Sequence, residues 1–145
     1  MPVYYDIFSD LNLVVYVCIG TVTPVDFFKI ADNVTLDLRL KAEMKIIIDF
    51  FHADLETVVS DLQLAITKDK EAKQRGQRNG QTAVLTTSTA LKYVGDALRL
   101  LSIDSVTNFG IFHTEQDVIH WLGLPYKETL RCWSEIRSKA GNVNL

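Results

Sequence analysis

Apolar and polar residues follow one another along the chain in blocks that predict strands and helices. Val3 to Phe8 alternates weakly, and the polar sequence SDLN separates it from the apolar run Leu13 to Ile19. Two β-rich runs joined by so short a polar link are typical of an antiparallel hairpin. The second run is apolar at successive positions, which indicates a central strand covered on both faces and ending at Gly20.

The rest of the chain repeats a strand-then-helix pattern. Buried strands are predicted over 44–50, 82–87 and 107–113, where β-branched, apolar and aromatic residues gather. A helical pattern follows each of them, and a last helix begins at Pro125. This order predicts an α/β fold with a mixed, mostly parallel sheet of four to five strands. The antiparallel hairpin opens the sheet, a helix follows each later strand, and a C-terminal helix ends the chain.

Capping residues mark several helix starts. Thr23 precedes a proline at the first helical position and stands three residues before Asp26. Thr114 has the same relation to Asp117, and Asp54 is predicted to cap the helix after strand 44–50. In the helix that begins after Thr23, the apolar stripe consists of Phe27, Phe28, Ile30, Ala31, Val34 and Leu38.

The last helix places Leu130, Trp133 and Ile136 or Arg137 on one side. We expect residues 1–124 to form one domain and residues 125–145 a helical extension. This extension packs either on the same domain, with Trp133 in its core, or on a partner subunit, with Trp133 anchoring the interface.

Composition narrows the class of protein. With 145 residues, 48% of them hydrophobic and 23% charged, the chain suits a single globular domain. A net charge of −3 argues against binding nucleic acid. The longest apolar run is far below the roughly 20 residues that a transmembrane helix needs. The first residues do not resemble a signal peptide, and the two cysteines are far apart, so we expect a reduced, cytoplasmic protein without an integral membrane segment.

Four phrases occur along the chain in the order GTVTPVDF, MKIIIDF, TAVLTTSTALKYVGDALRLL and FGIFHTEQDVIHWLGLP. Together they resemble the SpoIIAA-like family of small bacterial proteins, which is related to STAS domains and to the CRAL-TRIO fold. The resemblance covers roughly residues 3 to 125. It implies a SpoIIAA-like fold and lends no single activity.

The resemblance also bears on regulation. STAS proteins that antagonise anti-sigma factors carry a phosphoacceptor serine in an Asp-Ser-Ser-Gly turn after the third strand. The matching segment here, 49–56, reads DFFHADLE and contains neither serine nor threonine. The resemblance therefore implies a regulatory module without the usual phosphoacceptor.

A cluster of hydroxyl residues follows strand 82–87. Thr87, Ser88 and Thr89 can donate hydrogen bonds to an anion at the start of the next helix, and Lys92 adds a positive charge. Phosphate-binding loops, however, use glycine, and this turn has none. The alternative is that Ser88 or Thr89 caps the helix.

Asp49 and His52 occupy the carboxyl end of the neighbouring strand and are expected to face the same edge of the sheet. A base oriented by a carboxylate, with Ser88 as nucleophile, is conceivable there, but no nucleophile motif supports it. The histidines and cysteines have no metal-site spacing. We therefore predict no catalytic residue, no metal and no cofactor.

Two functions remain. The first is a non-catalytic regulatory or protein-interaction module with an unidentified protein partner or a homodimeric one. It predicts an exposed apolar patch near the last helix or the hairpin edge. The alternative is a small-molecule binding protein that holds a lipid or an anionic metabolite at the carboxyl edge of the sheet. Its pocket is predicted to be lined by Phe27, Phe50, Phe51 and Leu91.

Overall fold

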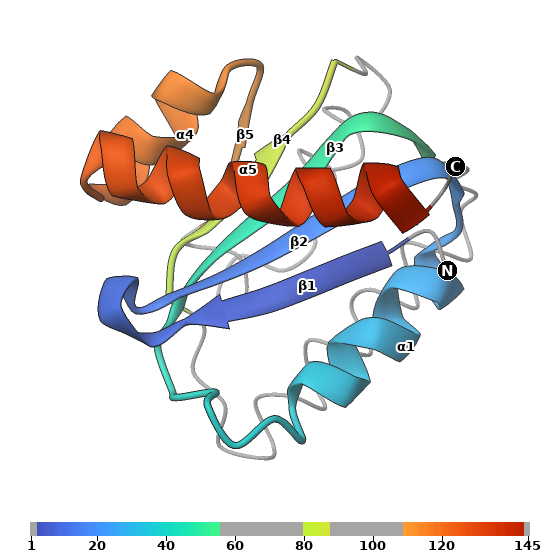
Figure 1. Cartoon of the computed structure of the whole chain (residues 1–145), viewed down its shortest axis with the longest axis horizontal. Coiled ribbons are helices and arrows are strands. Elements are labelled where there is room, and N and C mark those ends of the chain that lie inside the picture. The colour runs from blue at the N-terminus through green and yellow to red at the C-terminus, as the bar shows by residue number, and fades with distance from the viewer. Residues whose placement is uncertain (1–2, 56–79, 88–108, 144–145) are drawn as a thin grey trace.

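A computed structural model of the chain describes residues 3–55, 80–87 and 109–143 (Figure 1). The elements, in chain order, are β1 (Val3–Phe8), β2 (Leu13–Val22), α1 (Pro24–Val34), β3 (Lys45–Leu55), β4 (Thr82–Leu85), β5 (Phe109–Phe112), α4 (Glu115–Leu122) and α5 (Tyr126–Val143). The helices expected between β3 and β4 and between β4 and β5 fall largely in 56–79 and 88–108, outside the described residues.

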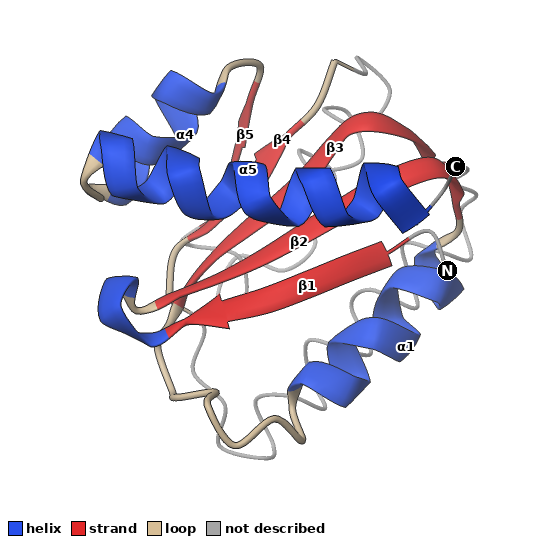
Figure 2. Cartoon of the chain, in the orientation of Figure 1, coloured by secondary structure: helices blue, strands red, loops and turns tan. Residues whose placement is uncertain are grey.

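The strands form one five-stranded sheet in the order β1-β2-β3-β4-β5 (Figure 2). β1 and β2 pair antiparallel, with Tyr5 opposite Tyr16, and the other three pairs are parallel. Between β1 and β2 the chain makes a short 3-10 turn, Ser9–Leu11, and Asn12 then takes a left-handed conformation with φ 52°. Asparagine tolerates that conformation well. The predicted mixed sheet opened by a hairpin is therefore confirmed.

Strand β2 serves two apolar layers because its successive side chains point to opposite faces. Leu13, Val15 and Val17 belong to the layer that α4 and α5 cover, whereas Val14 and Tyr16 belong to the layer that α1 covers. Figure 1 shows α4 and α5 on one side of the sheet and α1 on the other. All five of these residues are buried, as expected for a strand covered on both faces.

The predicted caps of α1 and α4 are confirmed. The Thr23 hydroxyl accepts from the Asp26 amide at 3.2 Å, and the Asp26 carboxylate accepts from the Thr23 amide at 3.3 Å. The Thr114 hydroxyl accepts from the Asp117 amide at 3.2 Å. These bonds satisfy amides that have no partner within the helix itself. Since Pro125 precedes the first residue of α5, the predicted start of the last helix is also confirmed.

Three expectations about element ends are wrong. β2 continues past Gly20, which takes φ 75°, to Val22, and β3 continues to Leu55. The two strands resume pairing beyond an irregularity between Val17 and Ile19, so each extends the other. Asp54 therefore lies in β3 opposite Thr21 and does not cap a helix beginning at residue 55.

The third error concerns the apolar stripe of the first helix. α1 ends at Val34, and Leu38 lies beyond it with its full surface exposed (102%). Ile30 and Val34 are buried as predicted. The spacing of Leu38 continues the helical period, but α1 ends at Val34, before Leu38.

Helix α5 packs on its own sheet. Trp133, Ile136 and Ala140 are buried in the layer that includes β2 and β3. Trp133 has no exposed surface (0%), which makes it part of the core of this chain. In the described parts of the chain, no helix combines the length and apolar character needed to cross a membrane.

Candidate functional site

The predicted ligand edge is only partly described. Asp49 is buried in β3 (1% exposed), whereas His52 and Thr87 are exposed. Ser88, Thr89 and Lys92 lie outside the described residues. The role of these six residues in binding a ligand therefore stays a prediction, and the contacts of Asp49 can be followed in detail.

The Asp49 carboxylate accepts hydrogen bonds from two side chains of α5. Trp133 Nε1 donates to Oδ2 at 2.8 Å, and Arg137 Nε donates to the same oxygen at 2.6 Å. The Phe51 amide donates to Oδ1 at 3.0 Å. A buried carboxylate is costly unless its oxygens are hydrogen-bonded, and here both are. The group ties β3 to α5.

Arg137 extends this network to α4. Its Nη1 donates to Glu115 Oε1 at 2.8 Å, and its guanidinium lies 5.0 Å from the centre of the Trp133 ring. Burial lowers the pKa of Arg137, but the hydrogen bond and attraction of Asp49, with those of Glu115, outweigh it and raise the pKa. We call Asp49, Glu115, Trp133 and Arg137 the Asp49 cluster.

The charges of the Asp49 cluster do not favour an anionic ligand. Two carboxylates face one guanidinium, so the cluster has a formal charge of −1. Arg137 Nη2 is buried and has no hydrogen-bond partner among the described residues. A ligand anion reaching that nitrogen would still meet two negative groups within the same network. The arrangement is better suited to holding α4, α5 and β3 together than to binding phosphate.

The network also predicts a pH dependence. The hydrogen bond from Arg137 lowers the pKa of Glu115. A lowered pKa in the folded state adds stability that is present above the unfolded pKa, near 4.3, and is lost as the pH falls through the folded pKa. Because Glu115 is partly exposed, we expect Glu115→Gln to cost less than about 1 kcal/mol at neutral pH.

This cost should shrink as the pH falls through that range, as measured by urea unfolding across an acid pH series. Glu128→Gln, an exposed residue on α5, is the matched control and should show no such dependence. A constant difference between wild type and Glu115→Gln at every pH would contradict the assignment.

In the described part of the chain, Asp49 does not orient His52 as a base. The hydrogen bonds of Asp49 go to Trp133, Arg137 and the Phe51 amide. The His52 ring instead makes an edge contact with the Phe51 ring, with centres 5.0 Å apart.

The predicted phenylalanine pocket is divided between the two faces of the sheet. Phe27 and Phe50 lie 6.1 Å apart on the α1 side, with Phe50 buried there. Phe51 lies under Arg137 of α5, 5.9 Å from its guanidinium carbon to the ring centre. Leu91 lies outside the described residues. The three described phenylalanines therefore do not line one pocket.

A second feature, which the sequence analysis missed, lies between α1 and β3. Leu36 is 79% exposed and Leu38 is 102% exposed. Asp37 lies between the two leucines, and Arg39 follows Leu38. The side chains of Asp37 and Arg39 point toward β1. We call Leu36 and Leu38 the leucine tip. The alternation of leucine with charged residues in LDLRL was the available signal.

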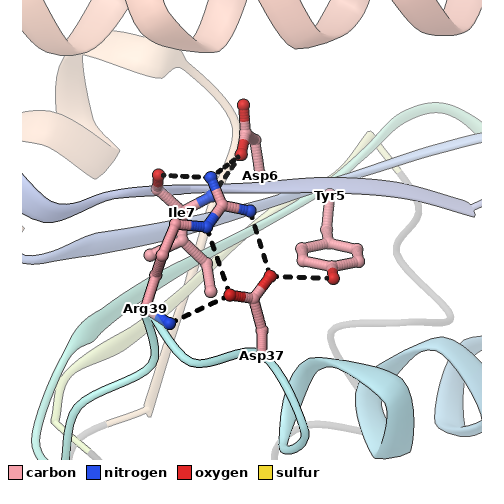
Figure 3. Close-up of polar contacts among 5 residues, drawn as sticks. All are labelled: Tyr5, Asp6, Ile7, Asp37 and Arg39. Atoms are coloured by element: carbon pink, nitrogen blue, oxygen red, sulfur yellow. Dashed lines mark hydrogen bonds and ion pairs between the residues drawn. The ribbon is translucent and has the colours of Figure 1, made fainter.

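Polar contacts of Asp37 and Arg39 hold the loop that carries the leucine tip beside the edge strand β1 (Figure 3). The Tyr5 hydroxyl donates to Asp37 Oδ2 at 3.1 Å, and Arg39 Nη2 donates to the same oxygen at 3.0 Å. Arg39 Nη1 donates to Asp6 Oδ1 at 2.7 Å. Hydrogen bonds from Arg39 are the main cause that lowers the pKa of Asp37. Asp37 is therefore ionised at neutral pH, and the tip is fixed at two points of β1.

No family model matches the chain, and no curated protein sequence matches it. Among solved structures, the chain is similar to an uncharacterised protein from Shewanella loihica PV-4, described as a member of the DUF3478 family with a SpoIIAA-like fold. The TM-score is 0.52 with 16% identity, over 83% of this chain and 91% of that one. The chain has a SpoIIAA-like fold. At this identity the likeness concerns the fold alone, and it confirms the architecture that the four sequence phrases implied.

Proposed function

We propose that this SpoIIAA-like domain is a non-catalytic regulatory or interaction module that binds a protein partner through its leucine tip. The observation that supports this most is the exposure of Leu36 and Leu38 beside β1. The interaction hypothesis predicts an exposed apolar patch near the last helix or the hairpin edge, and two exposed leucines in a loop tied to β1 support it. The partner that fits it is a protein with an apolar pocket or groove.

The energetics favour a role in binding. Burying a leucine side chain gains about 1.5–3 kcal/mol, so two exposed leucines represent a considerable unused gain. Single exposed apolar residues are common on protein surfaces, but these two lie two residues apart in one loop, and Asp37 and Arg39 tie that loop to β1. A loop already held in place loses less conformational entropy when it binds.

The Asp49 cluster supports the non-catalytic part of the proposal. A general base must lie within hydrogen-bond reach of the proton that it abstracts. Asp49 is 1% exposed, and both of its oxygens accept hydrogen bonds within the protein. The alternative of an anionic ligand has less support, because Arg137, which contacts Asp49 in the described part of the chain, is already paired with two carboxylates.

Photo-crosslinking tests the proposal. A photoreactive amino acid at position 38 should capture one protein partner in the native cell, because this side chain would be buried on binding. The same group at exposed Lys127 on α5 is the control and should not capture that protein. Equal capture from both positions, or none from position 38, would remove the support for a tip-mediated contact.

The double variant Leu36→Ser/Leu38→Ser separates binding from folding. Since both side chains are exposed, the free energy of unfolding should change by no more than about 0.5 kcal/mol. Capture through a photoreactive group at a neighbouring position, Lys41, should nevertheless fall sharply in this variant. A loss of capture accompanied by a large loss of stability would instead indicate misfolding.

A further inference from the structure

Strand β1 forms one outer edge of the described sheet. Among the described strands, β1 pairs only with β2 and stands first in the strand order. In an antiparallel pair, alternate residues direct both backbone groups either at the partner strand or away from it. An outward row of such groups is a template for pairing with another chain.

Ile7 directs its backbone groups away from β2. Its amide donates to Asp6 Oδ1 at 2.8 Å, and its carbonyl accepts a longer bond from Arg39 Nη1 at 3.4 Å. Arg39 Nη1 also binds Asp6 Oδ1, so one ion pair covers both groups of Ile7 (Figure 3). By the same alternation, Val3 and Tyr5 also direct their backbone groups outward.

The sequence of β1 makes this edge suited to self-pairing. VYYDIF consists of β-branched, aromatic and apolar residues apart from Asp6. Two copies of β1 can meet antiparallel across a two-fold axis, because such an interface presents the same surface from both subunits. An approaching strand would have to displace Arg39 and Asp6 from Ile7 before it could pair there.

We propose that the Asp6–Arg39 ion pair covers the outer edge of β1 and prevents another strand from pairing there. Without the ion pair, β1 pairs antiparallel with β1 of a second copy of this chain. This role explains why the side chains of Asp6 and Arg39, from two distant segments, meet over the backbone of Ile7. The inference does not depend on the proposed function, because it concerns the backbone edge and not the leucines.

Arg39→Ala is the decisive variant, and sedimentation velocity at matched protein concentrations is the measurement. We expect wild type to be monomeric and Arg39→Ala to sediment mainly as a dimer. Lys41→Ala removes an exposed cation from the same loop without touching β1 and should stay monomeric. In the Arg39→Ala dimer, hydrogen exchange at the Tyr5 and Ile7 amides should slow at least tenfold relative to wild type.

Two further variants locate the contact. Tyr5→Pro in the Arg39→Ala background removes an outward amide and should restore the monomer, because proline blocks ladder pairing at an edge. Leu36→Ser/Leu38→Ser in the same background should leave the dimer intact, which separates this inference from the role of the leucine tip. A monomeric Arg39→Ala protein, or a dimer with unchanged exchange at Tyr5 and Ile7, would overturn the proposal. If the variant with Tyr5→Pro fails to fold, hydrogen exchange at the Tyr5 and Ile7 amides of Arg39→Ala still tests the proposal.

Discussion

Asp49→Ala should lower the free energy of unfolding by about 3–5 kcal/mol, the range for breaking a buried ion pair by removing one partner. The loss leaves Trp133 Nε1 without its acceptor inside the core and removes the carboxylate that Arg137 Nε contacts at 2.6 Å. Arg137 keeps Glu115 and is partly exposed, which places the expected value toward the lower end of the range. Urea unfolding followed by circular dichroism measures the difference.

Asp49→Asn keeps one acceptor oxygen and should cost less than Asp49→Ala. Asp54→Asn, at an exposed position of the same strand, is the matched control and should change stability by no more than about 0.5 kcal/mol. If Asp49 were kept for a ligand at the expense of stability, its removal would leave the unfolding free energy unchanged or raise it. That outcome would contradict the structural role assigned to the Asp49 cluster.

Trp133→Ala should cost about 3–5 kcal/mol, as expected when a large buried aromatic side chain is removed from a core. Trp133 has no exposed surface and packs in the layer that contains Ile47 and Leu85. It joins α5 to strands that are remote in the sequence, so its removal should loosen the helix as well as leave a cavity. Thermal and urea unfolding both report this loss.

Trp133→Phe separates packing from hydrogen bonding. It retains most of the apolar volume but removes the donor to Asp49, so about 1–3 kcal/mol should be lost. The double variant Trp133→Phe/Asp49→Asn should lose less than the sum of the two single losses, because the residues share a hydrogen bond. Glu135→Ala, exposed on the same helix, should be nearly neutral. Strict additivity of Trp133→Phe and Asp49→Asn would contradict the direct coupling.

Local sequence patterns predicted the parts of the fold that depend on local physics. The caps Thr23 and Thr114 depend on a side chain and an amide three residues away, and both were predicted. The burial of β2 followed from its unbroken apolar run. The order of strands and helices then restricted the sheet to a small number of arrangements.

The remaining features depend on contacts between distant segments. β3 extends to Leu55 because β2 continues beside it, which no pattern within β3 shows. Asp49 and Trp133 are 84 residues apart, so a site residue and a core tryptophan could not be recognised as one hydrogen-bonded pair. Leu38 fits a helical period and still lies exposed, because α1 ends at Val34 and Arg39 is held at β1.

Titration calorimetry with the captured partner tests most directly the proposal that this domain binds through its leucine tip. Losing the burial of two leucines at about 1.5 kcal/mol each corresponds to a loss of affinity on the order of 100-fold. We therefore predict that Leu36→Ser/Leu38→Ser raises the Kd by about this factor, while Asp54→Asn leaves it unchanged. An unchanged Kd for the folded double variant would contradict the claim.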